Sequence, residues 1–82
     1  MKKILKFSAE WCLPCKSMAS MLSNMEIPLP IEEYDIDEDF EISTRFNIRG
    51  VPTIILVDEY GEEIARKTGL MSKEEFLNFC EK

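Results

Sequence analysis

Two cysteines, Cys12 and Cys15, stand where the hydrophobic pattern of the chain changes its period. The residues before them, Lys2 to Ser8, form a short apolar run that is typical of a β-strand. From Cys12 to about Met25, apolar residues recur at the spacing of an amphipathic helix. Pro14 is compatible with this interpretation, because the first turn of a helix tolerates a proline. The cysteine pair is therefore predicted to lie at the start of a helix that directly follows a strand.

Turn and capping signals divide the rest of the chain into further elements. Pro28 and Pro30 end the first helix, and a capping box of Ser72 and Glu75 marks the start of the last one. The predicted elements are a strand at Ile31–Ile36, a helix at Phe40–Phe46, a hairpin of strands Thr53–Val57 and Glu62–Lys67 around the turn "DEYG", and a helix from Ser72 to about Cys80. The order βαβαββα leaves no linker, so residues 1–82 are predicted to form a single α/β domain.

Charge and hydropathy exclude several classes of partner. Sixteen acidic and ten basic residues give a net charge of −6, the opposite of the basic surface that nucleic-acid phosphates select. The apolar run near the N-terminus is interrupted by Lys6 and Ser8 before a signal-peptide core could form. No segment approaches the roughly 20 apolar residues of a membrane span. We therefore expect a cytoplasmic protein that binds neither nucleic acid nor membrane.

The three cysteines leave two main interpretations of the Cys-x-x-Cys motif. In a reducing compartment such a pair indicates metal binding or redox chemistry more often than a structural disulfide. A tetrahedral metal site would need two ligands besides Cys12 and Cys15, and the chain has no histidine and only Cys80 as a further thiol. Carboxylates or a second chain would have to complete that site. Cys80 stands beside Phe76 and Phe79 and is predicted to be a small buried hydrophobic residue.

Two motifs, "AEWCLPCK" and "RGVPT", together with the predicted order of elements, resemble the thioredoxin family. The resemblance covers essentially the whole chain, which starts at what would be the second strand of a full-length thioredoxin and is similar in extent to a glutaredoxin. It implies a thioredoxin-like fold, in which a four-stranded mixed sheet of order 2-1-3-4 carries helices on both faces. It also implies that Pro52 follows a cis peptide bond, faces the cysteine pair and presents the backbone of Val51 to an extended substrate.

The chemistry of thiol–disulfide exchange predicts different roles for the two cysteines. The reaction needs a thiolate, and an ordinary cysteine with a pKa of about 8.5 is mostly protonated at neutral pH. Cys12, at the start of the helix, has the unpaired N–H groups and the positive end of the helix dipole to stabilise its negative charge. Cys15, one turn deeper, is expected to be buried and protonated. Cys12 is therefore predicted to attack a substrate disulfide, and Cys15 to resolve the mixed disulfide.

The resemblance implies a protein-disulfide reductase that needs no bound cofactor. Its electrons would come from a thioredoxin-reductase-type flavoprotein, its substrates would be proteins that contain disulfides, and it would act as a monomer. The predicted substrate-binding residues are Trp11, Leu13, Pro14, Val51, Pro52 and Gly69.

Two alternatives remain open at this stage. The short chain suggests a glutaredoxin-like reductant that uses glutathione, although "WCLPC" and "RGVPT" look thioredoxin-like and no Gly-Gly pair stands at Gly69. The second alternative is a non-catalytic binding module. In it, the surface of Trp11, Leu13, Pro14 and Val51 docks a partner and the thiols are incidental.

One departure from the thioredoxin pattern concerns a pair of charges. Typical thioredoxins have a buried aspartate six residues before the first cysteine and a lysine near it on the neighbouring strand, and here those positions hold Lys6 and Glu33. Our hypothesis is that Lys6 and Glu33 form the same pair with the signs exchanged, and that Glu33 accepts the proton of Cys15. The alternative is that Lys6 extends to solvent and Glu33 is an ordinary surface acid.

Overall fold

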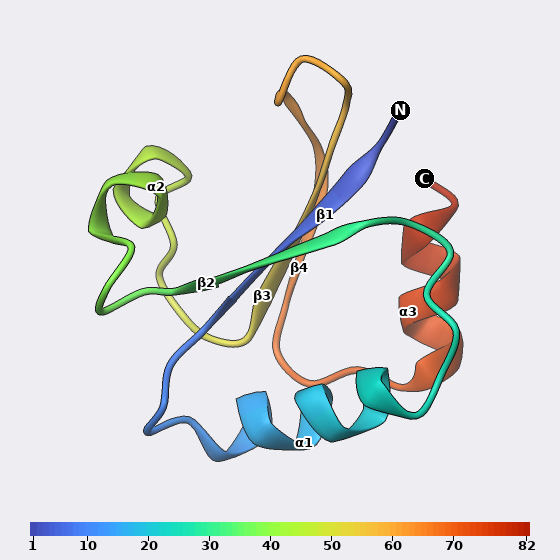
Figure 1. Cartoon of the computed structure of the whole chain (residues 1–82), viewed down its shortest axis with the longest axis horizontal. Coiled ribbons are helices and arrows are strands. Elements are labelled where there is room, and N and C mark those ends of the chain that lie inside the picture. The colour runs from blue at the N-terminus through green and yellow to red at the C-terminus, as the bar shows by residue number, and fades with distance from the viewer.

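The computed structural model describes all residues, 1–82, and contains four strands and three helices in the predicted order (Figure 1). The strands are β1 (Lys3–Ser8), β2 (Ile31–Asp35), β3 (Thr53–Val57) and β4 (Glu63–Thr68), and the helices are α1 (Leu13–Ser23), α2 (Phe40–Arg45) and α3 (Lys73–Cys80). All of these bounds lie within two residues of the predicted ones. None of the helices has both the length and the apolar character that crossing a lipid bilayer requires.

The four strands form one mixed sheet in the order β2-β1-β3-β4. β1 pairs with β2 in parallel and with β3 in antiparallel orientation, and β3 pairs with β4 in antiparallel orientation. This arrangement confirms the predicted order 2-1-3-4. β1 is a central strand and ends at Ser8. The residues that follow it, which include the cysteine pair, therefore start from the middle of the sheet at the C-terminal end of β1.

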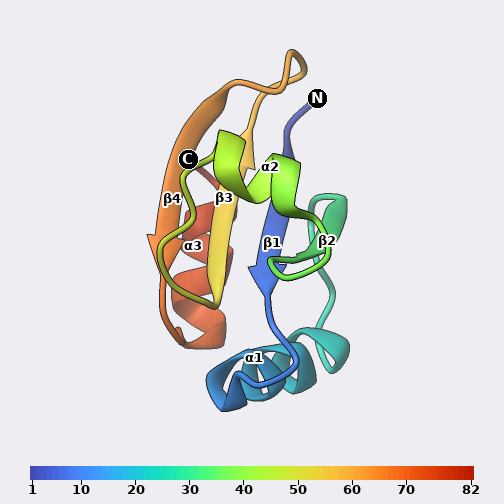
Figure 2. The same ribbon diagram turned by 90° about the vertical axis from the view of Figure 1, so that its left-hand side faces the viewer.

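Helices cover both faces of the sheet, as predicted. Alternate residues of a strand point to opposite faces, so β1 and β3 contribute to two separate cores. On one face, Ile4 and Ile54 pack in a cluster with Met18 of α1 and with Phe76 and Phe79 of α3. The other face holds the buried side chains Leu5, Phe7, Ile55 and Val57, against which Ile42 and Phe46 pack from the α2 region. Figure 2 accordingly shows α2 in front of the sheet and α3 behind it.

Capping residues define where α1 and α3 begin. Cys12 is the N-cap of α1, with the extended backbone angles φ −94° and ψ 107°, and Pro14 lies in the first turn of that helix. At α3 the predicted capping box is present: Ser72 Oγ accepts a hydrogen bond of 3.1 Å from the Glu75 N–H, and the Glu75 carboxylate accepts one of 2.9 Å from the Ser72 N–H. The two helix starts are therefore set by local side-chain chemistry.

Candidate functional site

Cys12 and Cys15 lie in the connection between β1 and α1 and are joined by a disulfide bond. Their Cα atoms are 5.2 Å apart. β1 ends at Ser8, and the turn at residues 10 and 11 leads directly to Cys12, the N-cap of α1. The predicted placement of the pair between a strand and a helix is thus observed.

Hydrogen bonding distinguishes the two sulfur atoms. The backbone N–H of Cys15 donates to Cys12 Sγ over 3.1 Å, so the sulfur of Cys12 occupies the position of a capping side chain at the positive end of the helix dipole. A negative charge on this sulfur would be stabilised by that N–H and by the dipole, which is the environment that lowers the pKa of a cysteine.

Cys15 is buried, as expected, but Cys12 is buried as well, so burial does not distinguish the two cysteines. Each residue is only 4% exposed in the disulfide-bonded state. Both pack in one small cluster with Ala9, against which Val51 and Ile36 also pack. The sequence pattern could not indicate this, because residues that are distant in the chain cover Cys12. The difference between the two cysteines therefore rests on hydrogen bonding alone.

The segment before β3 approaches the disulfide from the other side. The Val51–Pro52 peptide bond is cis, in agreement with the conformation that the resemblance implied. The carbonyl oxygen of Val51 lies 3.6 Å from Cys12 Sγ, and Gly69, at φ +99°, donates its N–H to the carbonyl oxygen of Pro52 over 2.8 Å. The fold thus brings Val51, Pro52 and Gly69 to the cysteine pair, and their part in substrate binding stays a prediction.

Exposed apolar side chains surround the disulfide. Trp11 is 67% exposed and Leu13 is 72% exposed, and Pro14 is exposed beside them. The indole Nε1–H of Trp11 donates to Asp37 Oδ2 over 3.0 Å, and this hydrogen bond holds the ring against the segment after β2. Sequence reasoning missed both Asp37 and Leu70, which is 56% exposed and directly follows Gly69. Leu70 could have been found from the sequence, because it is an apolar residue directly after Gly69, the glycine that follows the last strand.

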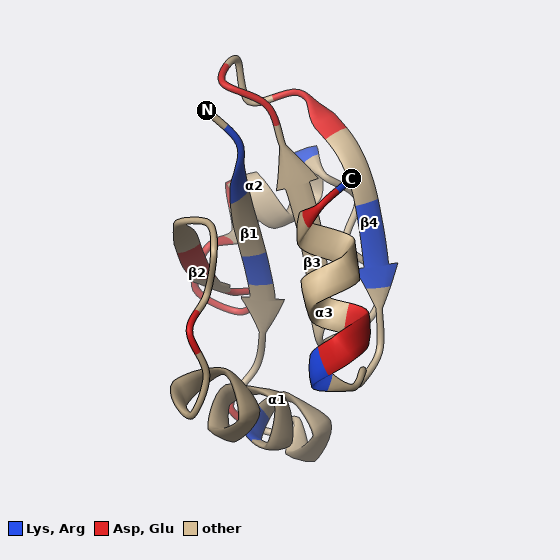
Figure 3. Cartoon of the chain, turned by 90° about the vertical axis from the view of Figure 1, so that its right-hand side faces the viewer, with Lys and Arg blue, Asp and Glu red and all other residues tan.

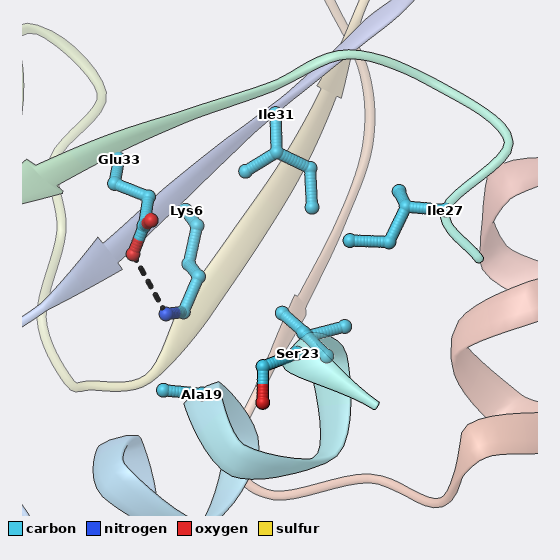
Figure 4. Close-up of a pocket in the computed structure, with 7 residues that line it drawn as sticks. Lys6, Ala19, Ser23, Ile27, Ile31 and Glu33 are labelled. Atoms are coloured by element: carbon cyan, nitrogen blue, oxygen red, sulfur yellow. Dashed lines mark hydrogen bonds and ion pairs between the residues drawn. The ribbon is translucent and has the colours of Figure 1, made fainter. Parts of the chain in front are cut away.

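Lys6 and Glu33 form the ion pair that we hypothesised. They are register partners on β1 and β2, and Lys6 Nζ donates to Glu33 Oε1 over 3.0 Å (Figure 4). The side chain of Lys6 is only 4% exposed and that of Glu33 is 68% exposed, so Lys6 does not extend to solvent. Both line a cavity of about 220 Å³ whose other walls are Ala19, Leu22, Ser23, Ile27 and Ile31. Cys15 does not line this cavity, and the role of Glu33 as proton acceptor stays a prediction.

The third cysteine is separate from the pair. Cys80 is 6% exposed and belongs to the core cluster of Phe76 and Phe79, as predicted, whereas Cys12 and Cys15 belong to another cluster. Burial raises the pKa of the Cys80 thiol, and the nearby charge of Glu81 adds to this effect. No three His, Cys, Asp or Glu side chains are grouped so that they could hold a metal ion. The position of Cys80 in the core makes it unsuitable as a third ligand beside the pair.

Comparisons with known proteins agree on one family. The family model described as thioredoxin matches residues 1–82. A thioredoxin of Chlamydia pneumoniae is 35% identical over 82 residues, which cover 96% of this chain and 79% of that protein. An SPbeta prophage-derived thioredoxin-like protein of Bacillus subtilis, YosR, is 32% identical over 72 residues, which cover 88% of each chain. Among solved structures, Fasciola hepatica thioredoxin superposes with a TM-score of 0.86 at 23% identity, covering 98% of this chain and 78% of that one.

Proposed function

The chain belongs to the thioredoxin family, and on that premise we propose that it is a thiol–disulfide oxidoreductase that reduces protein disulfides through Cys12 and Cys15. The observation that carries the proposal is the position of Cys12 as the N-cap of α1, with its Sγ accepting the N–H of Cys15 over 3.1 Å. This position favours a thiolate at neutral pH, and the thiolate is the form that attacks a disulfide.

In the first step, the Cys12 thiolate attacks one sulfur of the substrate disulfide. A new bond forms between that sulfur and Cys12 Sγ, and the substrate S–S bond breaks. The second substrate sulfur leaves as a thiolate and takes a proton from solvent. The product is a mixed disulfide between Cys12 and the substrate.

In the second step, Cys15 loses its proton and attacks Cys12 Sγ. The mixed disulfide breaks, and the remaining substrate sulfur leaves as a thiolate that is protonated in turn. Two electrons have then passed from the cysteine pair to the substrate, and the two protons that the substrate thiolates take from solvent balance those that Cys12 and Cys15 have released. The Cys12–Cys15 disulfide of the structure corresponds to the oxidised product of this reaction.

We assign the acceptance of the Cys15 proton to Glu33, with Lys6 as the positioning residue. The support for this is the 3.0 Å ion pair and the 68% exposure of the Glu33 side chain, because an exposed carboxylate can pass a proton on to solvent. Since Cys15 does not line the cavity that Glu33 shares with Lys6, the transfer would need at least one water molecule between the Cys15 thiol and the Glu33 carboxylate. The measurement is the pH dependence of the resolving step in Glu33→Ala. An unchanged dependence would show that Glu33 has no such role.

Substrates would dock on the exposed apolar rim of Trp11, Leu13 and Pro14 and on the backbone of Val51, with Pro52 and Gly69 completing the surface. A thioredoxin-reductase-type flavoprotein would return electrons to the disulfide, so the protein itself needs no bound cofactor. The proposal includes a monomer that acts in the cytoplasm, where a reducing environment maintains such a dithiol.

The deciding experiment is an insulin disulfide reduction assay with two electron supplies. One supply is NADPH with a thioredoxin reductase, and the other is NADPH with glutathione and glutathione reductase. We expect turnover with the first supply. Turnover with the second alone would assign the protein to the glutathione-dependent alternative.

Three variants separate catalysis from simple binding. Cys15→Ser should trap substrates as mixed disulfides on Cys12, because the thiol that resolves them is absent. Cys12→Ser should trap none, because it lacks the thiol that attacks the substrate. If the variant that carries both Cys12→Ser and Cys15→Ser kept the biological activity, the protein would be a binding module and the redox proposal would fail.

A further inference from the structure

The structure contains a second cavity near the redox site, and no apolar side chain lines it. Its volume is about 360 Å³. Its walls come from the segment before Pro52 and from β3 and β4, and the lining residues are Asn47, Arg49, Gly50, Thr53, Arg66 and Thr68. Every other cavity of the molecule has apolar residues in its lining. Two guanidinium groups and no carboxylate line this cavity, although the chain as a whole carries a net charge of −6.

Hydrogen bonds hold the walls of this cavity in place. Arg66 donates from Nε and Nη2 to the Glu63 carboxylate, over 2.7 Å each, and from Nη2 to the Phe46 carbonyl oxygen over 2.8 Å. Thr53 Oγ1 donates to the Gly50 carbonyl oxygen over 2.6 Å and lies 3.2 Å from Thr68 Oγ1. These bonds tie β4 to the end of α2 and to the segment before β3, so the cavity is preformed.

The charge balance indicates which anion the cavity would take. Glu63 neutralises Arg66, whereas the exposed Arg49 has no ion pair. Figure 3 shows the corresponding pattern along β4, where an acidic segment is followed by the basic segment of Arg66 and Lys67. One uncompensated positive charge matches a singly charged carboxylate better than a doubly charged phosphate, and a guanidinium is suited to bind a carboxylate through two hydrogen bonds.

The cavity lies beside the surface on which a substrate would dock. Thr53 directly follows Pro52, and Thr68 directly precedes Gly69, which donates its N–H to the Pro52 carbonyl oxygen over 2.8 Å. Arg49 is two residues before Val51, whose carbonyl oxygen lies 3.6 Å from Cys12 Sγ. An extended chain advances about 3.3 Å per residue, so two or three residues span roughly 7 to 10 Å along this segment.

We propose that the cavity of Arg49 and Arg66 binds the carboxylate of an aspartate or glutamate that lies two or three residues from the target cysteine of a peptide substrate. The inference rests on the proposed function, because it requires a substrate cysteine that reacts with Cys12. It gives the protein a preference among disulfide substrates that the apolar rim of Trp11 and Leu13 alone would not provide.

The test uses a set of short peptides, each with one cysteine in a mixed disulfide with a chromophoric thiol. Each peptide carries a single glutamate at one position from three residues before to three residues after its cysteine, and the reference peptide has glutamine throughout. The protein is first reduced with dithiothreitol and freed of it. The rates are then compared for the unaltered chain, for Arg49→Gln and for Lys73→Gln. Lys73 is a matched control because it is exposed at the start of α3, has no ion pair and is not part of the cavity.

We expect the unaltered chain to reduce the peptide with glutamate at one of the distal positions about three- to tenfold faster than the glutamine peptide. Arg49→Gln should remove this preference while leaving the rate with the glutamine peptide unchanged, and Lys73→Gln should preserve it. Raising the salt concentration should reduce the preference, since ionic strength screens exposed charges.

Four results would overturn the inference. The first is that no glutamate position is preferred, and the second is that Arg49→Gln slows the reduction of all peptides equally. In both cases the peptides are still reduced, so the proposed function stands. Glutathione disulfide is measured as a further substrate, and a loss in Arg49→Gln that is confined to it would assign the cavity to the carboxylates of glutathione. If no peptide is reduced at all, the proposed function fails and this inference fails with it.

Discussion

The Lys6–Glu33 pair allows a prediction of opposite effects from its two members. Glu33→Gln leaves the ammonium of Lys6 in its buried position, where the side chain is 4% exposed, without a charged partner. Lys6→Met removes the buried charge, keeps a long side chain and leaves only the exposed Glu33 unpaired. We expect Glu33→Gln to be destabilising and Lys6→Met to be neutral or stabilising.

The magnitude follows from the exposure of the two groups. Removing one partner of a fully buried ion pair destabilises a protein by about 3–5 kcal/mol, because an uncompensated charge remains. The cavity of about 220 Å³ beside Lys6 can admit water, which restores part of the lost solvation of the ammonium. We therefore expect Glu33→Gln to lower the free energy of unfolding by about 1–2 kcal/mol, between the values for exposed and for buried pairs. In a domain of this size about 1 kcal/mol corresponds to a shift in Tm of about 4–8 °C.

The assay is urea unfolding at pH 7, followed by far-ultraviolet circular dichroism with the Cys12–Cys15 pair oxidised in every variant. Glu26→Gln is a matched control, because Glu26 is exposed and has no ion pair. In the Lys6→Met background, Glu33→Gln should change the free energy of unfolding by less than about 0.5 kcal/mol, since no partner remains. The reasoning is refuted if Lys6→Met destabilises the protein more than Glu33→Gln does.

Three further predictions concern the rest of the fold. Met18→Ala should destabilise the domain by about 2–5 kcal/mol in urea unfolding, because Met18 is 0% exposed within the core cluster, and a loss below 1 kcal/mol would contradict this packing. The hydrogen bond from the Ser72 N–H holds the pKa of Glu75 below its ordinary value of 4.5. The ionised Glu75 therefore stabilises the fold above that pH, and this stabilisation is lost as the pH falls through the lowered pKa. Glu75→Gln should make the free energy of unfolding fall less steeply on the acid side, and an unchanged slope there would contradict the capping box. The Cys80 thiol, which burial keeps at a raised pKa, should react with a disulfide reagent at least tenfold more slowly in the native oxidised protein than in urea, and equal rates would show that it is accessible.

The secondary structure and the cysteine pair could be predicted because their signals are local. The spacing of apolar residues around Met18, the prolines after α1 and the pairing of Ser72 with Glu75 each depend on neighbours within a few positions. The strand-to-helix position of Cys12 follows from the same local change of period. This is why all predicted bounds lie within two residues of the observed ones.

Other features of the site depend on segments that only the tertiary structure brings together. The burial of Cys12 depends on the packing of Ile36 and Val51 against its cluster, and the orientation of Trp11 on its hydrogen bond to Asp37, 26 residues away. Neither contact leaves a periodic signal in the sequence, so sequence reasoning predicted the burial of Cys15 but not that of Cys12.

The sequence by itself determined the order of the elements and the position of Cys12 between a strand and a helix, because residue spacing along the chain is enough for both. It also showed that Lys6 and Glu33 stand where typical thioredoxins have an aspartate and a lysine, because residue identity is enough for that comparison. The tertiary structure decided that Lys6 is buried while Glu33 is exposed, and that Arg49 and Arg66 share a polar cavity next to Pro52. The physical reason is that burial and charge proximity depend on which strands and loops become neighbours in space, and β2 and β4 meet Lys6 and Arg49 only after the sheet has formed.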